Sequence, residues 1–178
     1  MIALDHRVER WIVEHRVSWL DQVFVWLSKV GGFGWIFLVV ALAVALFYRR
    51  PQIVLLTLGA DVVADLLDRG IKEAVDRQRP HLPPTEPPPL VRLPTDPSFP
   101  SGHAATCFAC AVMLALLVPR LAVPVLVLAA AIAYSRLYLG VHYPLDVIGG
   151  AALGALVAIA LRRLAASRIR SRPPLRAG

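Results

Sequence analysis

The sequence predicts an all-α, polytopic membrane bundle of about five spanning helices, preceded by an amphipathic helix at the amino terminus. Hydrophobic residues make up 57% of the 178 residues and charged residues only 17%, which is far more apolar than a soluble domain. Five runs with few charges approach the length of a membrane helix, some only with neighbouring residues included. The amino-terminal residues instead alternate between apolar and charged positions at helical spacing.

The predicted spans are joined by short connections except at one place. The first covers 19 uncharged residues between Lys29 and Arg49, and the second runs from Pro51 to Lys72, a length of about 30 Å. Three shorter apolar runs predict the remaining spans at 104–119, 121–135 and 147–161. Residues 69–102 contain nine of the 15 prolines, which excludes a continuous helix or a regular strand. We expect this segment to be either an ordered cap or an exposed linker.

The first 30 residues predict an interfacial segment. Apolar side chains at Leu4, Val8, Trp11 and Ile12 recur at helical spacing, with charged residues between them. Ser18 and Asp21 match a capping pair for a second short helix. A helix packed on the bundle would show the same pattern. The chain then divides into an amphipathic segment, a membrane domain and a basic tail, at 1–30, 31–166 and 167–178.

The distribution of basic residues predicts the orientation in the membrane. With alternating spans, one side has no acid and nine bases: Arg49, Arg50, Arg120, Arg162, Arg163, Arg168, Arg170, Arg172 and Arg176. The other side has ten bases and all 12 acids, mostly in long, charge-compensated segments. Because short basic loops and tails stay in the cytoplasm, the acid-free side is expected to be cytoplasmic. The net charge of +7 then reflects topology and contact with anionic lipid rather than nucleic-acid binding.

Three acids recur at helical spacing on the second span. Asp65 precedes Arg69 by four residues, and Asp68 precedes Lys72 by four, so paired charges that face the bundle are expected. Asp61 has no base at such a spacing. An unpaired acid inside a membrane is a candidate for function, although the sequence suggests no role for this one.

Unusual polar residues gather at the ends of four predicted spans. They form four short stretches at 72–80, 100–103, 135–136 and 142–146. Because consecutive spans alternate in direction, all four stretches lie on the same side of the membrane. Their lysine, arginines and histidines can therefore converge, and such a cationic group predicts a site for a multiply charged oxyanion.

A phosphate group fits the cations and the backbone of this cluster. Arg79 and Arg136 each offer a planar pair of donors to phosphoryl oxygens, and Lys72 adds a compact charge. Ser101 and Gly102 come just before the third span, where free amide groups and the helix dipole favour an anion. Glycine also allows the backbone to approach the ligand closely.

The two histidines of the cluster have different neighbours. Pro144 is a suitable first residue for the last span, which puts Asp146 in its first turn, four residues after His142. A carboxylate on one ring nitrogen fixes the tautomer and makes the other nitrogen a better nucleophile. His103 is then free to act as the proton donor, because imidazoles with different neighbours can hold different protonation states.

These residues resemble the type 2 phosphatidic acid phosphatase superfamily of membrane lipid phosphatases. Its pattern is Lys-x6-Arg-Pro, then Pro-Ser-Gly-His, then Ser-Arg-x5-His-x3-Asp. Every position is present here, as Lys72, Arg79-Pro80, Pro100-Ser101-Gly102-His103, Ser135-Arg136, His142 and Asp146. The order and spacing of three separate motifs across residues 72–146 make the resemblance specific.

The resemblance implies a mechanism, a location and a substrate class. His142 would attack phosphorus, Asp146 would orient it, and His103 would protonate the leaving oxygen and later activate water. The phosphoryl oxygens would be bound by Lys72, Arg79, Ser101, Gly102 and Arg136. No metal or other cofactor is needed, since fixed cations can stabilise the transition-state charge. The family usually has six membrane helices and an extracytoplasmic site in the plasma membrane, whereas five spans and an amphipathic segment are counted here.

The substrate implied by the resemblance is a lipid phosphate or diphosphate held in the bilayer, and we favour a polyprenyl diphosphate. Undecaprenyl diphosphate, phosphatidylglycerophosphate, phosphatidate and polyprenyl phosphosugars are the candidates. Transfer of the phosphoryl group to another alcohol is a further alternative. A small lipid transporter or flippase is the alternative of another class, and it would predict inverted repeats, for which the sequence shows no symmetry. The sequence predicts neither a nucleic-acid partner nor an oligomeric state.

Overall fold

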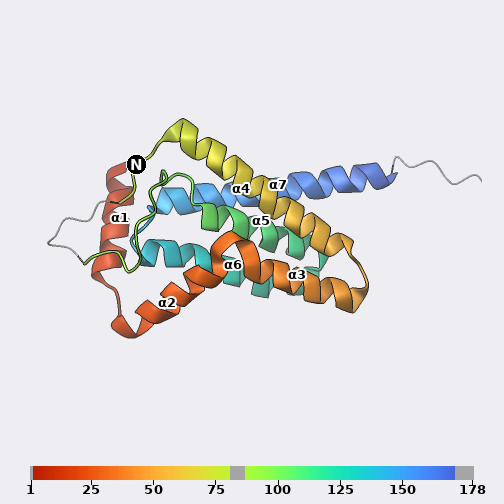
Figure 1. Cartoon of the computed structure of the whole chain (residues 1–178), viewed down its shortest axis with the longest axis horizontal. Coiled ribbons are helices and arrows are strands. Elements are labelled where there is room, and N and C mark those ends of the chain that lie inside the picture. The colour runs from red at the N-terminus through yellow and green to blue at the C-terminus, as the bar shows by residue number, and fades with distance from the viewer. Residues whose placement is uncertain (1, 81–86, 171–178) are drawn as a thin grey trace, which may run out of the picture.

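The apolar runs form helices that pack around a central helix, α5, in the computed structural model of the chain (Figure 1). The structure describes residues 2–80 and 87–170. Within these ranges the helices are α1 (Ile2–Glu14), α2 (Ser18–Gly31), α3 (Trp35–Tyr48), α4 (Gln52–Val75), α5 (Gly102–Leu117), α6 (Ala122–Tyr138) and α7 (Pro144–Arg170). Two 3-10 turns, η1 (Gly32–Gly34) and η2 (Pro119–Leu121), join neighbouring helices. The predicted all-helical membrane bundle is confirmed.

Helices α2 and α3 follow one another in a single kinked pass. The kink is at Phe33 and Gly34, whose φ angles of 50° and 61° are left-handed. Together with η1 these helices form a 31-residue apolar stretch, Ser18–Tyr48, that is long enough to cross a membrane. The predicted boundary at residue 30 falls inside this stretch, and the division into domains stays a prediction.

The other predicted spans correspond to α4 through α7. By length and composition, Pro119–Tyr138 and Pro144–Ser167 are also candidate spans, whereas α5 is apolar but shorter, with 16 residues. Pro144 begins α7 as predicted. The predicted capping pair near residue 18 was wrong, because the side chain of Ser18 caps nothing and Asp21 instead accepts a hydrogen bond from the hydroxyl of Tyr138 at 2.8 Å. The predicted basic tail lies mostly outside the described residues.

Close backbone contact joins α5 to α7. A side chain at Gly150 would collide with the carbonyl of Ser101, and one at Gly154 would collide with the carbonyl of Ala105. The spacing of these glycines indicates small-residue packing of membrane helices, and the structure confirms it. This contact fixes the start of α7 beside the start of α5, where the predicted site residues lie.

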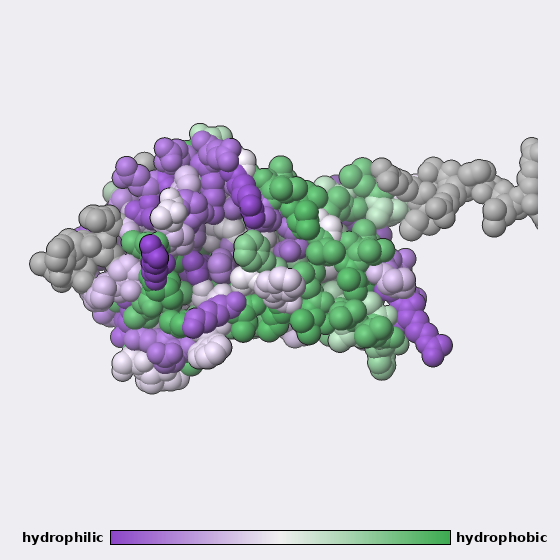
Figure 2. Space-filling view, viewed as in Figure 1, coloured by the Kyte–Doolittle hydropathy of each residue, from purple (hydrophilic) through white to green (hydrophobic). Residues whose placement is uncertain are grey.

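The polar and apolar residues separate along the bundle. Figure 2 shows a hydrophobic belt over the helices and a hydrophilic end where α1 lies. At this end α1 crosses the bundle, with Asp5 and Glu9 buried and Leu4, Val8 and Trp11 exposed. Ile12 and Val13 are buried on the same side as the two acids, so Leu4, Val8 and Trp11 form an outward apolar strip, which fits a helix lying in a membrane interface.

The charges of α4 pair as the sequence predicts, but only the Asp68–Lys72 pair is buried in the bundle, since the side chain of Arg69 is largely exposed. The carboxylate of Asp65 lies 2.8 Å from the guanidinium of Arg69, and that of Asp68 lies 3.1 Å from the Nζ of Lys72. Asp61 is buried beside the kink, where its Oδ1 lies 3.6 Å from the Sγ of Cys110. Its place beside Gly34 and Cys110 separates it from the cluster at the polar end of α4.

Candidate active site

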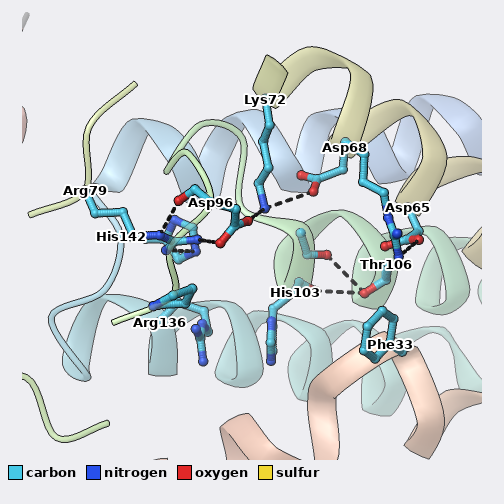
Figure 3. A pocket seen from close by; sticks show the side chains of 13 residues that line it. Phe33, Asp65, Asp68, Lys72, Arg79, Asp96, His103, Thr106, Arg136 and His142 are labelled. Atoms are coloured by element: carbon cyan, nitrogen blue, oxygen red, sulfur yellow. Dashed lines mark hydrogen bonds and ion pairs between the residues drawn. The ribbon is translucent and has the colours of Figure 1, made fainter. Parts of the chain in front are cut away.

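The four polar stretches meet around a cavity of about 380 Å³ (Figure 3). Six of the predicted site residues line it: Lys72, Arg79, Gly102, His103, Arg136 and His142. The other two, Ser101 and Asp146, are buried next to it, one before α5 and the other in the first turn of α7. The structure therefore brings all the predicted site residues together at one end of the bundle.

The end of α4 directs two arginines toward the start of α7. Asp76 follows the helix with a φ of 46°, a left-handed conformation that ends α4 and turns the chain. The segment is then held to the proline-rich loop, since the amide of Ser98 donates to the carbonyl of Arg77 at 2.7 Å. Arg77 and Arg79 therefore extend from a fixed backbone. The described part of this loop, 87–101, covers the site and contacts the bundle through Pro88, Leu90, Asp96 and Ser98.

His142 lies between a carboxylate and a guanidinium. The Oδ2 of Asp146 accepts the amide hydrogen of Tyr143 at 2.9 Å and lies 3.5 Å from the Nδ1 of His142. On the other side of the ring, Nη1 of Arg79 lies 3.1 Å from Nε2. Because a guanidinium only donates, Nε2 is the acceptor, and the network assigns the proton of the neutral ring to Nδ1. The lone pair of Nε2 therefore faces the cation that lines the cavity.

The surroundings of His142 keep its ring uncharged. Its pKa is lowered from 6.5 to about 4: burial is the largest cause, the bond to Asp146 opposes it, and the charges of Arg136 and Arg79 add to it. At neutral pH the imidazole is therefore a neutral base, as a nucleophile requires. The unfolded chain binds a proton below pH 6.5 and the folded chain only near pH 4, so this group makes the protein less stable as the pH falls between these values.

We expect the resonance of His142 to titrate well below that of an unperturbed histidine. In detergent-solubilised protein with labelled histidine, its signal is identified by its absence in His142→Gln, and its midpoint should fall near pH 4. The measurement is a histidine NMR titration without substrate, so the ionisation of a phosphate does not interfere. A midpoint above 7 would show that the ring is mostly charged at neutral pH, where it is assigned as a nucleophile.

Several buried polar groups near the cavity have no partner among the described residues. These are Nε of Arg136, the hydroxyl of Ser101 and Oδ1 of Asp68, whereas Nδ1 of His142 has the carboxylate of Asp146 at 3.5 Å. Arg136 is held from the other side, where its Nη1 contacts the hydroxyl of Ser28 on α2. Buried donors are costly unless a ligand satisfies them, so Arg136 and Ser101 indicate where an anion binds. A side chain at Gly102 would come within 2.9 Å of Asp68, which explains the glycine.

Asp96 occupies the cations that the sequence assigned to phosphate (Figure 3). Its Oδ2 lies 2.5 Å from the Nζ of Lys72, and its Oδ1 lies 2.8 Å from Nη2 of Arg79. Burial would raise the pKa of Asp96, but the hydrogen bond from Lys72 and the charge of Arg79 hold it at about 2. The carboxylate is therefore ionised at physiological pH and takes the place that phosphoryl oxygens would take.

We expect Asp96→Asn to tighten binding of a phosphate ligand. An amide carries no charge, so a phosphoryl group would no longer compete with a carboxylate for Lys72 and Arg79. The KM for a lipid phosphate should fall, and inorganic phosphate should inhibit at lower concentration, which steady-state kinetics in detergent micelles will measure. If KM instead rises and inhibition by phosphate weakens, Asp96 orients the two cations rather than competing for them.

The site contains residues that the motifs did not reveal. Asp96 lies in the proline-rich loop, and Phe33, Asp65, Arg69 and Thr106 line the cavity farther along α4, η1 and α5. Within residues 2–80 and 87–170, no group of three or more His, Cys, Asp or Glu side chains is placed to hold a metal ion. The cavity is instead lined by cations and histidines that can bind a phosphoryl group directly.

Comparison with known proteins decides the family. The sequence profile of the PAP2 superfamily matches residues 34–170. The chain belongs to the PAP2 superfamily. It is a membrane lipid phosphate phosphatase, and the resemblance found in its three motifs is confirmed. Asp5 and the rest of α1 and α2 lie before the matched residues of this PAP2 phosphatase.

Similar proteins include two polyprenyl lipid phosphatases. The decaprenylphosphoryl-5-phosphoribose phosphatase of Mycobacterium tuberculosis is 40% identical over 139 residues, which cover 78% of this chain and 76% of the relative. The undecaprenyl-diphosphatase of Sulfolobus acidocaldarius is 34% identical over 146 residues, covering 80% and 69%. The crystal structure of a transmembrane PAP2-type phosphatidylglycerolphosphate phosphatase from Bacillus subtilis matches with a TM-score of 0.78 and 30% identity, covering 96% of this PAP2 phosphatase and 88% of that chain.

Proposed function

We propose that this PAP2 phosphatase removes the terminal phosphate of a polyprenyl-linked phosphate or diphosphate through a phosphohistidine on His142. The observation that carries the mechanism is the uncharged ring of His142, with Asp146 at Nδ1 and a cation at Nε2. Nε2 attacks phosphorus, and the bond from phosphorus to the oxygen of the lipid breaks. Burial and the charge of Arg136 lower the pKa of His103 to about 3, so without substrate its ring is uncharged, and it takes up a proton when the dianionic phosphate binds beside it. The protonated ring then gives this proton to the leaving oxygen, and the lipid leaves as an alcohol or as a lipid monophosphate.

The second half of the reaction reverses the role of His103. The neutral imidazole takes a proton from a water molecule, whose oxygen attacks phosphorus. The bond between phosphorus and Nε2 breaks, inorganic phosphate forms, and His142 regains its lone pair. Throughout, Lys72, Arg79 and Arg136 offset the charge of the phosphoryl oxygens, as fixed donors do in other phosphoryl transfers.

The shape of the cavity supports a substrate that stays in the membrane. The cavity runs from His142 past Thr106 to Phe33, Asp65 and Arg69, that is, from the polar end of the bundle toward η1 and the middle of α4. Phe33 is 58% exposed at the kink. A lipid can place its phosphate at the histidines while its chain lies beside η1 and α4, because Phe33 of η1 and Val62 and Leu66 of α4 are exposed apolar side chains.

The relatives support a polyprenyl substrate. Two of the three compared proteins act, by their names, on decaprenyl or undecaprenyl lipids. Polyprenyl diphosphate and polyprenylphosphoryl phosphosugar share the chemistry that the site requires, a terminal phosphate on a membrane-bound carrier. Phosphatidylglycerophosphate is the second candidate, which the match to the Bacillus subtilis structure favours.

A lipid panel tests the proposal. Purified protein in detergent, with a chelator present, is given polyprenyl diphosphate, polyprenylphosphoryl phosphoribose, phosphatidylglycerophosphate, phosphatidate and p-nitrophenyl phosphate, and phosphate release is measured. We expect release from at least one polyprenyl lipid at the highest kcat/KM. A preference for a glycerophospholipid would contradict the proposed polyprenyl substrate but not the mechanism. Turnover of only the soluble ester would exclude a membrane substrate, and a requirement for divalent metal would contradict the mechanism.

We also propose that the site faces the extracytoplasmic side of the plasma membrane. The support is the arginine-rich, acid-free set of loops predicted for the opposite end. Thr95 is exposed on the cap over the site, and Cys107 and Cys110 are buried. A Thr95→Cys variant should therefore react with a membrane-impermeant thiol reagent on intact cells. Reaction only after the cells are opened would reverse the orientation.

A further inference from the structure

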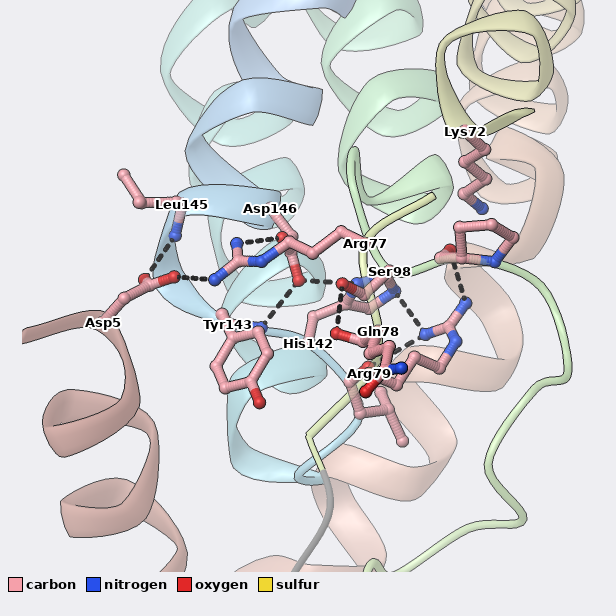
Figure 4. A network of polar contacts seen from close by, with 12 residues as sticks. Asp5, Lys72, Arg77, Gln78, Arg79, Ser98, His142, Tyr143, Leu145 and Asp146 are labelled. Atoms are coloured by element: carbon pink, nitrogen blue, oxygen red, sulfur yellow. Dashed lines mark hydrogen bonds and ion pairs between the residues drawn. The ribbon is translucent and has the colours of Figure 1, made fainter. Parts of the chain in front are cut away.

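Helix α1 places a buried carboxylate against the residues that hold His142 (Figure 4). The side chain of Asp5 is 1% exposed, and its Oδ2 accepts a hydrogen bond from Nη2 of Arg77 at 2.5 Å. Its Oδ1 accepts the amide hydrogen of Leu145, in the first turn of α7, at 2.8 Å. Nη1 of Arg77 donates in turn to Oδ1 of Asp146 at 2.5 Å. A chain of charged groups therefore runs from α1 to His142.

Aromatic contacts hold the same elements together. The ring of His6 stacks on that of Tyr143 with 4.4 Å between centroids, and the guanidinium of Arg77 lies 4.4 Å from the centroid of Tyr143. Arg77 thus has a carboxylate on either side and an aromatic ring below it, and its side chain is 19% exposed. Such a guanidinium has little freedom to move, because each of its two terminal nitrogens donates to a different carboxylate.

The balance of charge behind His142 depends on Asp5. Arg77 alone would neutralise Asp146, whereas with Asp5 present two carboxylates oppose one guanidinium and leave a net negative charge. When Nε2 of His142 bonds to phosphorus, the ring keeps its proton on Nδ1 and becomes cationic. A net negative charge at Nδ1 stabilises that cation, and a neutral pair would not.

We propose that Asp5 is a positioning residue for phosphoryl transfer. It compensates the charge of Arg77, so that the carboxylate of Asp146 can stabilise the cationic ring of His142. Helix α1 then belongs to the functional unit, although it precedes the residues 34–170 that match the family. The sequence indicates Asp5 only as one charge of an amphipathic helix. This inference rests on the proposed function of His142.

The direct test is Asp5→Asn. The amide keeps an acceptor for the amide of Leu145 and removes the charge that faces Arg77, so it separates electrostatics from capping of α7. We expect kcat to fall about 10-fold with KM unchanged, since outer partners of functional histidines contribute about 10- to 100-fold at metal sites. The concentration of folded enzyme is measured as the monodisperse fraction in size-exclusion chromatography, so that partial unfolding does not count as a loss of kcat.

Two further readouts separate positioning from a structural role. In an Arg77→Gln background, Asp5→Asn should cause no further loss, because the charge it compensates is gone, and Arg77→Lys should keep more activity than Arg77→Gln. Asp5→Asn should also shift the NMR titration of His142 to lower pH. The charged groups that face this ring, Asp146, Arg79 and Arg136, are unchanged in that variant. The shift in the pKa of His142 therefore measures the effect of the charge of Arg77 that Asp5 no longer compensates.

The matched control is Asp21→Asn, which removes another acid near the amino terminus. Asp21 joins α2 to α6 through Tyr138 and touches neither His142 nor Arg77, so its kcat per folded enzyme should equal that of wild type. The inference is wrong if Asp5→Asn keeps the wild-type kcat, or if both variants lose kcat equally. A wild-type protein that forms no phosphohistidine would contradict the proposed function. A wild-type protein that forms it, with an Asp5→Asn variant of equal kcat, would contradict only the role of Asp5.

Discussion

His142→Ala is expected to lower phosphate release from the lipid substrate by at least about 10³-fold, because it removes the atom that forms the bond to phosphorus. The ring is buried between Asp146 and Arg79, so no other side chain can take its place at Nε2. Binding should largely survive, since Lys72 and Arg136 remain. The measurements are steady-state phosphate release and trapping of radioactive phosphate on the protein, and the variant should show neither.

The matched control for this variant is His15→Ala. His15 is exposed at the end of α1, where its Nδ1 lies 2.8 Å from the carbonyl of Trp11, and it lies outside the cavity. That variant should retain both turnover and the acid-labile phosphoenzyme. A labelled phosphoenzyme in His142→Ala would identify another nucleophile, and wild-type turnover in that variant would exclude covalent catalysis by His142.

The convergence of the site could be predicted because it follows from topology. The motifs lie at the ends of successive spans, and alternation of the spans brings those ends to one side without any long-range information. Pro144 and Asp146 could be placed in the first turn of α7 for a local reason, since proline suits the start of a helix and the acid follows at a fixed spacing. Close packing of the last span could also be predicted locally, from the four-residue spacing of Gly150 and Gly154, which contact α5.

Asp5 and Asp96 could not be assigned because their partners are set by docking. The bond between Asp5 and the amide of Leu145 joins residues 140 positions apart, and it depends on how α1 lies across the end of the bundle. The periodicity of α1 shows two faces but not which of them meets the protein. Here the buried face carries Asp5 and Glu9 together with Ile12 and Val13, whereas Leu4, Val8 and Trp11 are exposed. Asp96 lies among prolines, where no periodic pattern indicates a direction for the side chain.

The same docking explains how a site rich in cations can remain stable without its substrate. Lys72 lies between Asp68 and Asp96, Arg79 is paired with Asp96, and Arg77 is paired with two acids. Arg136 has only a hydroxyl partner at Nη1 and an unpartnered Nε within the described residues. The uncompensated positive charge is therefore concentrated at Arg136, beside His103 and His142 on the wall of the cavity. That is where the charge of a transferred phosphoryl group would develop.

His103→Ala is expected to lower turnover of a lipid phosphate by about 10²- to 10⁴-fold, the usual contribution of a general acid and base. Its effect should depend on the leaving group, and this dependence separates its role from that of His142. An alkoxide needs a proton to leave, so phosphorylation of His142 by a lipid phosphate should be slow. A nitrophenolate leaves without one, so phosphorylation by p-nitrophenyl phosphate should be nearly normal.

Hydrolysis of the phosphoenzyme still needs a base to activate water, and His103→Ala lacks it. The variant should therefore release one equivalent of nitrophenol per active site in a rapid burst, then turn over slowly while the phosphohistidine accumulates. Rapid-mixing absorbance and phosphate trapping measure the two quantities on the same sample. His142→Ala should show no burst, because its defect precedes the covalent intermediate. Loss of the acid alone leaves the first step intact for nitrophenolate. If His103→Ala shows neither a burst of nitrophenol nor phosphoenzyme, His103 instead binds or orients the phosphate.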